Sequence, residues 1–196
     1  MEPKFIVLTG MKHCGKSTTG RELARRLGLP FFDIDDRITV CSGKTPRELY
    51  DQGGAELFRA REAAAAALLA EELNSGVKTG QPAAVIAAGG GLCDNEAAVA
   101  ALKRGGLFVY LSAPEELLME RILASAERDG RFPAYISCRN PQNKEEISAI
   151  FHSYYILRTE KYDILADMLV QTERKSIGEI TEGIIQGLSP ILNRRD

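Results

Sequence analysis

The octapeptide Gly10–Ser17 (GMKHCGKS) has the most informative spacing in the chain. It matches Gly-x4-Gly-Lys-Ser/Thr and lies between an expected strand, Phe5–Thr9, and an expected helix, Thr18–Leu27, as a phosphate-binding P-loop requires. The glycines let backbone N–H groups converge on phosphate oxygens, and the helix N-terminus adds positive potential there. We therefore expect a nucleoside triphosphate site, in which Lys16 bridges the outer phosphates and the Ser17 hydroxyl binds Mg²⁺.

A P-loop alone is compatible with kinases, motor proteins and GTPases. A guanine-specific switch would carry Asn-Lys-x-Asp late in the chain, whereas the nearest string, Asn143–Glu146, reads Asn-Lys-Glu-Glu, which disfavours a GTPase. No expected strand ends in the aspartate of a usual Walker B motif, since the apolar run Val85–Ala88 leads into the glycine triplet Gly89–Gly91. A carboxylate for the metal must therefore come from elsewhere.

Two candidate carboxylates, Asp33 and Asp35, follow the expected strand Pro30–Phe32. If the alternation of the strand continues, both side chains face the same way. In a phosphoryl-transfer site, one carboxylate can hold a metal-bound water while the other accepts or orients the proton of an attacking hydroxyl. The alternative is that both aspartates only cap a helix that starts near Asp36.

A long helical stretch carries two arginines, Arg59 and Arg61, in front of Glu62. Arginines on a solvated helix face are the default interpretation, and a functional role is the alternative. Both interpretations stay open on the residue pattern alone. Within the P-loop, His13 is expected to contribute its backbone rather than its imidazole, and Cys14 has no visible redox partner.

The elements expected to position these residues alternate along the chain. Short apolar runs predict five strands, at Phe5–Thr9, Pro30–Phe32, Val85–Ala88, Leu107–Leu111 and Met168–Gln171. The stretches between them are long enough for crossover helices, and the spacings in Thr45–Glu48 and Ser176–Glu179 predict capped helix starts. This alternation favours an α/β fold with a parallel sheet and helices on both faces.

Two regions interrupt the alternation within a single expected domain, residues 1–196. Residues 35–74 are helical without a strand, and we expect them to project as a flap rather than to serve as a crossover. Residues 127–146 contain two prolines and a glycine without a sustained period, which predicts a mobile lid.

The composition excludes several classes of protein. With 44% hydrophobic and 27% charged residues and a net charge of −2, the chain lacks both the bias of a disordered protein and the basic surface of a nucleic-acid binder. Its apolar runs are too short for a membrane span, and no secretion signal is visible. The four cysteines are too widely spaced for a Cys-x-x-Cys metal site, so we expect reduced thiols and a cytoplasmic protein without nucleic-acid or membrane partners.

Taken together, these motifs resemble the shikimate kinase family. In the family's order and close to its spacing, the chain carries the P-loop, Asp33-x-Asp35, Phe58-Arg59-x-x-Glu62, the glycine triplet, and Arg158-x-x-x-Tyr162 followed by Ala166-Asp167. The resemblance implies a three-layer P-loop kinase fold, in which a five-stranded parallel sheet of order 2-3-1-4-5 has helices on both faces, a helical substrate-binding flap and a mobile lid. It also implies the transfer of the γ-phosphate of MgATP to the 3-hydroxyl of shikimate, a step of chorismate and aromatic amino acid biosynthesis. We expect the protein to be a monomer.

The resemblance further assigns roles to matching residues. The ATP phosphates would be bound by His13, Cys14, Gly15, Lys16, Ser17 and Thr18. Mg²⁺ would be held by Ser17 directly and by Asp33 through water, and Asp35 would be the candidate base for the acceptor hydroxyl. Lys175 would lie at the nucleotide, where the family often has arginine.

The acceptor would be held by three further residues. Arg59 and Arg158 would clamp its carboxylate, and Gly90 would donate a backbone N–H at a place where a side chain would block the approach. Arg131 would be the lid arginine that reaches the transferring phosphate, although the lid reads Arg131-Phe132-Pro133-Ala134 where the family usually has Arg-Pro-Leu-Leu.

Two alternatives remain. A sibling kinase for another polyol or hydroxy acid, such as gluconate, would be expected to lack Phe-Arg-x-x-Glu and the glycine triplet. A non-catalytic module that only binds ATP would have no need of Asp35 together with the carboxylate-clamping arginines.

Overall fold

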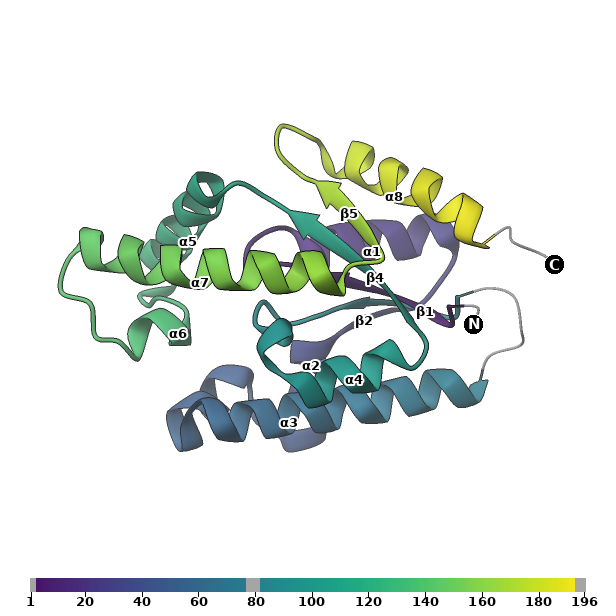
Figure 1. The fold of residues 1–196 in the computed structure, drawn as a ribbon. Helices are drawn as coiled ribbons and strands as arrows, with labels where there is room; N and C mark the ends of the chain where they lie inside the picture. The colour runs from purple at the N-terminus through teal and green to yellow at the C-terminus, as the bar shows by residue number, and fades with distance from the viewer. Residues whose placement is uncertain (1–2, 77–81, 193–196) are drawn as a thin grey trace.

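The computed structural model describes residues 3–76 and 82–192, and its centre is a five-stranded sheet (Figure 1). The strands are β1 (Phe5–Thr9), β2 (Phe31–Asp33), β3 (Val85–Ala87), β4 (Gly106–Ser112) and β5 (Met168–Gln171). All neighbours pair in parallel, in the order β2-β3-β1-β4-β5. The sequence-based strand positions are correct to within one residue at each end, and the expected strand order is confirmed.

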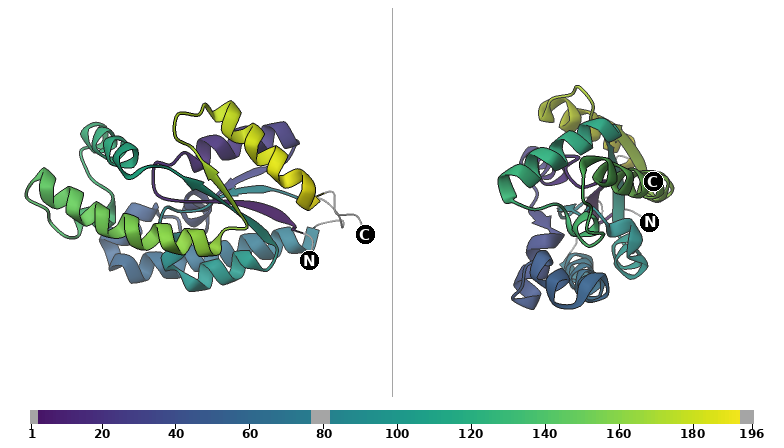
Figure 2. Two further views of the ribbon diagram at one scale, coloured as in Figure 1. Left: turned by 45° about the horizontal axis from the view of Figure 1, so that its top comes forward. Right: turned by 90° about the vertical axis from the view of Figure 1, so that its left-hand side faces the viewer.

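Helices cover both faces of this sheet (Figure 2). They are α1 (Lys16–Leu27), α2 (Ile34–Ser42), α3 (Pro46–Gly76), α4 (Glu96–Lys103), α5 (Glu115–Asp129), α6 (Ala134–Ser137), α7 (Lys144–Leu165) and α8 (Ile177–Leu192), with a short 3-10 helix, η1 (Leu92–Asp94). Alternate residues of β1 contribute to the two hydrophobic cores, one on each face of the sheet. Ile6 and Leu8 pack with α1, α5, α7 and α8 on one face. Phe5 and Val7 pack with α2, α3 and α4 on the other face. A strand that is apolar on both faces is typical of a parallel sheet.

The stretch 35–74 is helical as expected, but it also connects β2 to β3. Within α3, Ala65, Ala66 and Leu69 are buried against the sheet-facing core, so the expectation that this segment serves no crossover is wrong. The helix is interrupted at Gly53 and Gly54, where Gly54 has a φ of 65° that favours glycine.

Both predicted capping boxes are present. The Glu48 carboxylate accepts hydrogen bonds from the backbone N–H and hydroxyl of Thr45 at 2.7 and 2.8 Å, at the start of α3. Glu179 accepts the same pair of bonds from Ser176 at the start of α8. These caps satisfy backbone donors that a helix N-terminus leaves without partners.

The expected lid contains a helix that the sequence pattern does not reveal. After α5 ends at Gly130, the four-residue helix α6 forms and the ring of Tyr135 packs edge-on against Tyr154 of α7, with 4.8 Å between the ring centroids. Aromatic packing between distant segments therefore orders a segment whose local sequence predicts only a loop.

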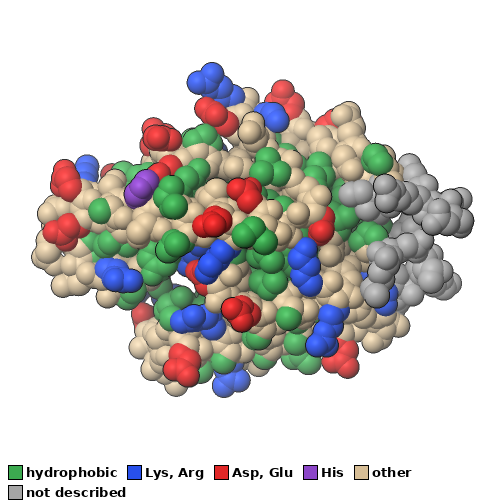
Figure 3. All heavy atoms as spheres, in the orientation of Figure 1, with side chains coloured by type: hydrophobic (Ala, Val, Ile, Leu, Met, Phe, Trp, Pro, Cys, Tyr) green, Lys and Arg blue, Asp and Glu red, His purple; other side chains and the backbone are tan. Residues whose placement is uncertain are grey.

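On the face seen in Figure 3, acidic and basic side chains are interspersed, in keeping with the net charge of −2. No helix in the described part of the chain is long and apolar enough to span a membrane.

Candidate active site

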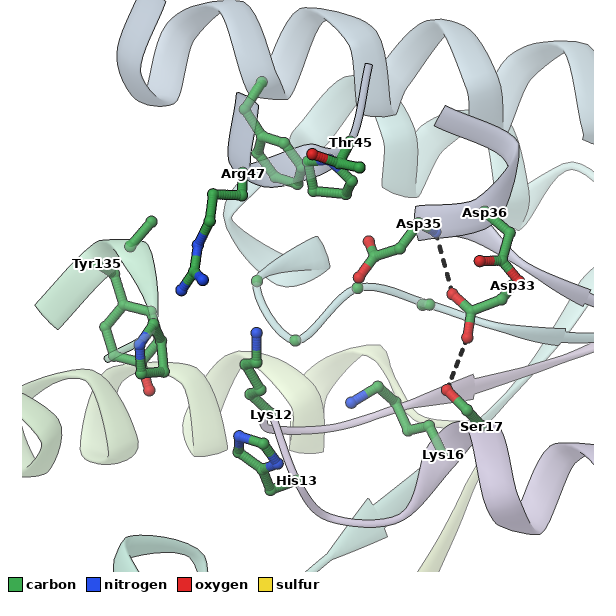
Figure 4. A pocket seen from close by; sticks show the side chains of 18 of the residues that line it. Lys12, His13, Lys16, Ser17, Asp33, Asp35, Asp36, Thr45, Arg47 and Tyr135 are labelled. Carbon is green, nitrogen blue, oxygen red and sulfur yellow. Dashed lines mark hydrogen bonds between the residues drawn. The ribbon is translucent and has the colours of Figure 1, made fainter. Parts of the chain in front are cut away.

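The carboxyl ends of β1, β2 and β3 meet at one edge of the sheet, and a cavity of about 860 Å³ opens there (Figure 4). Ligands of open parallel sheets bind at this edge. Of the predicted site residues, the cavity is lined by His13, Gly15, Lys16, Ser17, Thr18, Asp33, Asp35, Gly90 and Arg158. The structure thus brings together residues that are up to 145 positions apart in the sequence.

The P-loop wraps around the start of α1 in a conformation that needs positive φ angles. Gly15 has a φ of 99° and His13 a φ of 67°. The Lys16 ammonium is almost fully buried and donates hydrogen bonds to the backbone oxygens of Gly10 at 3.0 Å and Met11 at 2.8 Å. The loop therefore holds its lysine in place by backbone contacts.

The backbone of His13 contacts a neighbouring helix, whereas its expected part in phosphate binding stays a prediction. Its carbonyl oxygen accepts a hydrogen bond from Arg121 of α5 at 2.8 Å. Burial, together with the nearby charges of Lys12 and Lys16, lowers the pKa of the His13 imidazole to about 4, so that the ring is neutral at pH 7. Arg121 was not predicted, because nothing in the sequence distinguishes it from other arginines of a solvated helix.

A second cavity of about 360 Å³ continues from the first on the other side of the P-loop. It shares His13, Gly15 and Thr18 with the first cavity and is also lined by Cys14, Arg121, Arg128, Lys175 and Ile177. The predicted residues Cys14 and Lys175 thus lie in this cavity, at the end away from Asp35. An elongated ligand bound across the P-loop could reach both cavities.

Asp33 and Asp35 lie together in the first cavity, but not because a strand alternates. Asp33 is the N-cap of α2, and its Oδ1 accepts a hydrogen bond from the backbone N–H of Asp35 at 3.0 Å. Its Oδ2 accepts one from the Ser17 hydroxyl at 2.6 Å. Since α2 begins at Ile34, Asp35 lies in the first helical turn, so strand alternation does not bring the two carboxylates together. Asp33 does cap a helix, but the same carboxylate also binds Ser17.

The electrostatics of Asp35 suit a proton acceptor. Asp35 is exposed to the open cavity, but the protein around it partly desolvates its carboxyl, which together with the negative charge of Asp33 raises the pKa of that carboxyl. Lys12 and Lys16 act in the opposite direction. A carboxylate with a raised pKa is a stronger base than an ordinary aspartate.

The glycine triplet makes close contacts with the P-loop. A Cβ atom on Gly90 would lie 2.7 Å from the backbone nitrogen of Lys12, and one on Gly89 would lie 2.7 Å from Glu62 Oε1. Glycine is therefore needed at position 90 for packing of the chain itself, whereas the sequence analysis explained it by the approach of a ligand.

Arg158 lies on the opposite side of the triplet and is 6% exposed. Its Nε donates to Asp94 Oδ2 at 2.8 Å and its Nη1 to the Gly90 carbonyl at 3.3 Å, while its guanidinium packs over the rings of Tyr135 and Tyr154. Asp94 also pairs with Lys161 at 2.6 Å. Asp94 was not predicted, because its position just after the triplet carries no periodic or motif signal.

Two predicted arginines do not line either cavity. Arg59 is exposed, and its Nε donates to the backbone oxygen of Ala55 in the same helix at 3.2 Å. Arg131 is exposed as well and lies 3.9 Å from Asp51 across the gap between lid and flap. The roles expected of both side chains stay predictions.

Glu62 is a buried carboxyl beside the first cavity, 1% exposed. Its Oε2 accepts a hydrogen bond from Asn95 at 2.8 Å, whereas its Oε1 has no hydrogen-bond partner among the described residues. Burial raises the pKa of the Glu62 carboxyl from an ordinary 4.5 to about 7. Between pH 4.5 and about 7, the Glu62 carboxyl is therefore protonated in the folded protein but ionised in the unfolded chain.

This raised pKa predicts a pH-dependent effect of Glu62→Gln on stability. As pH rises from about 4.5 to about 7, Glu62 makes the wild type progressively less stable, because ionisation favours the unfolded chain. The variant has no such proton and keeps an oxygen for Asn95. Its Tm relative to wild type should therefore increase across this window and level off above it, as measured by thermal denaturation at several pH values.

Glu71→Gln, an exposed substitution on the same helix, is the matched control for this measurement. A Tm difference for Glu62→Gln that stays constant from pH 4.5 to 7 would show that Glu62 is ionised in the folded protein.

Comparison with known proteins places the chain in a family. The family profile described as shikimate kinase matches residues 12–189. A shikimate kinase of Syntrophus aciditrophicus is 33% identical over 190 residues, covering 94% of this chain and 91% of the relative. A shikimate kinase of Colwellia psychrerythraea is also 33% identical, over 95% of this chain and 98% of the relative.

Solved structures agree with this result. The structure described as shikimate kinase from Acinetobacter baumannii in complex with shikimate has a TM-score of 0.79 and 26% identity, and covers 100% of this chain and 97% of that chain. A gluconokinase from Sinorhizobium meliloti has a TM-score of 0.57 at 20% identity over 97% of this chain and 94% of its own, which shows a shared fold alone. The resemblance seen in the motifs is thus confirmed, and the chain belongs to the shikimate kinase family of ATP-dependent phosphotransferases.

Proposed function

We propose that this chain transfers the γ-phosphate of ATP to the 3-hydroxyl of shikimate, giving shikimate 3-phosphate. The single observation that carries the proposal is one cavity in which a phosphate-binding lysine, a carboxylate with a raised pKa and a buried arginine lie together. A nucleotide phosphate, an attacking hydroxyl and a carboxylate are the three groups that such a set would bind.

The P-loop would hold the nucleotide phosphates through its N–H groups and Lys16. The Ser17 hydroxyl and the Asp33 carboxylate, 2.6 Å apart, are oxygen donors of the kind that Mg²⁺ prefers, so these residues fit the expected metal. Bound Mg²⁺ would neutralise charge on the β- and γ-phosphates. The rest of the nucleotide would extend into the second cavity, toward Lys175.

Asp35 would accept the proton of the acceptor hydroxyl. The oxygen of that hydroxyl would bond to the γ-phosphorus, while the bond from the γ-phosphorus to the oxygen of the β-phosphate breaks and ADP leaves. Lys16 would stabilise the negative charge on the transferring group. Arg158, held by Asp94 and the Gly90 carbonyl, would bind the acceptor carboxylate with the N–H groups that remain. Arg59 and the Gly90 N–H would complete acceptor binding.

The other expectations belong to the same proposal. The flap, residues 35–74, would bind the acceptor, and the lid, residues 127–146, would close over the nucleotide and bring Arg131 to the phosphate. Both would be parts of a single domain, residues 1–196, acting as a cytoplasmic monomer without nucleic-acid or membrane partners.

The direct test is an ADP-release assay with MgATP against shikimate, quinate and gluconate, supported by identification of the phosphorylated product. We expect shikimate to be preferred by more than tenfold. Preference for gluconate would favour the sibling kinase instead, and release of ADP at a background rate with every acceptor would favour a module that only binds ATP.

Asp94→Ala tests the positioning of Arg158. Loss of a charged hydrogen-bond partner costs about 1.5 kcal/mol or more, so we expect KM for shikimate to rise about tenfold or more while KM for ATP stays within twofold. Asp94→Asn, which keeps an acceptor oxygen without the charge, should lie between wild type and Asp94→Ala. Glu96→Gln, an exposed change two residues further on, is the control. An equal rise of both KM values would indicate general damage to the site.

A further inference from the structure

Two cations of the first cavity have no part in the proposed function. Lys12 belongs to the P-loop and Arg47 to the first turn of α3, and both line the cavity. Figure 4 shows the two side chains extending from opposite walls toward the same space, with Asp35 to one side and Tyr135 to the other. Flap and P-loop thus each supply one positive charge.

These charges are not neutralised by the protein. Within residues 3–76 and 82–192, neither Lys12 nor Arg47 forms an ion pair with a carboxylate. Arg47 donates from Nη2 to the carbonyl oxygen of Phe132 in the lid at 3.2 Å, which leaves other N–H groups of its guanidinium for a ligand.

The surroundings of Lys12 make an anion favourable. Lys12 is exposed to the cavity. Partial desolvation by the surrounding walls lowers the pKa of its ammonium, and the positive charges of Arg47 and Lys16 lower this pKa further, whereas Asp35 and Asp129 act in the opposite direction. Like charges that face one cavity repel each other. An anion bound between the two cations would offset their mutual repulsion, so this space favours a negatively charged group.

The position of the pair indicates which anion it would meet. The Lys12 backbone lies against Gly90, and its ammonium acts on both Asp35 and Lys16, so it lies where the phosphate donor and the hydroxyl acceptor must meet. Arg158, which lies against Gly91, is the residue already proposed for the acceptor carboxylate. The group that arrives near Lys12 during the reaction is therefore the phosphoryl group.

We propose that Lys12 and Arg47 form an anion-binding pair that holds the phosphoryl group after its transfer to the acceptor, as a phosphate monoester. This inference rests on the proposed function and adds to it a site for the product. Because Arg47 also contacts the lid at Phe132, the pair is completed by segments from the P-loop and the flap and is braced by the lid.

The test is calorimetric binding of shikimate and of shikimate 3-phosphate to wild type, Lys12→Met, Arg47→Met and Lys12→Arg. In both methionine variants, Kd for shikimate 3-phosphate should rise at least tenfold while Kd for shikimate changes less than twofold. Lys12→Arg, which keeps the charge, should recover most of the affinity. Lys144→Met, an exposed lysine at the start of α7, is the control.

Two results would overturn the pair. An unchanged Kd for shikimate 3-phosphate would remove both cations from the product site, and an equal loss for shikimate would assign them to the acceptor carboxylate. Since Lys12 lies in the P-loop, Arg47→Met keeps the test decisive if Lys12→Met does not fold. Failure of the proposed function is a separate outcome, because it would appear as absence of shikimate turnover in wild type.

Discussion

Replacing Asp35 by asparagine is expected to lower kcat by about 10²–10³-fold, because the acceptor hydroxyl loses the group that takes its proton. Asparagine keeps the size and a hydrogen-bonding oxygen, so the KM values for shikimate and ATP should change by less than about threefold. Steady-state kinetics with a coupled ADP-release assay measure both quantities, with Asp163→Asn, an exposed aspartate on α7, as the control.

The pH dependence gives this prediction a second readout. The raised pKa of Asp35 means that wild-type kcat should fall as pH drops through a range above that of an ordinary aspartate, since the protonated carboxyl cannot accept a proton. The asparagine variant should lack this acidic limb. Near-normal turnover in Asp35→Asn would leave Asp35 without a catalytic role.

Lys16→Met is expected to cause a loss of kcat of similar size, about 10²–10³-fold, because the variant lacks the ammonium that we propose stabilises the transferring phosphate. KM for ATP should rise as well, since the same charge meets the phosphates in the ground state. Steady-state kinetics test this loss, and thermal denaturation checks that the loop survives without the bonds from Lys16 to Gly10 and Met11. A folded Lys16→Met protein with wild-type kcat would contradict the proposed role.

The sheet was predictable because its strands are apolar on both faces and the P-loop marks where β1 ends. Ile6, Val7 and Leu8 are completely buried, and such runs stand out against helical periodicity. The helix α6 within the expected lid was not predictable, since it depends on Tyr135 packing against Tyr154, a contact between segments that local sequence does not connect. The break at Gly53 and Gly54 likewise has no periodic signal.

The site divides in the same way. Motif spacing was enough to group four residues of the site, because each lies at or shortly after the end of a strand and these strands end at the same edge of the sheet. They are Lys16, Ser17, Asp33 and Asp35. Asp94, Arg47 and Lys12 were missed because their partners come from other elements. Asp94 acquires meaning only when α7 brings Arg158 to it, 64 residues further along the chain.

The contact of Arg158 with Tyr135 couples acceptor binding at Arg158 to the arrangement of the lid. Tyr135 belongs to the lid helix α6, and its ring centroid lies 4.8 Å from the Arg158 guanidinium carbon. An acceptor that draws Arg158 into one orientation also biases the lid toward the arrangement that packs on it. If a nucleotide closes the lid as proposed, reciprocity of coupled equilibria requires it to tighten acceptor binding by the same factor, so we expect the two substrates to bind synergistically.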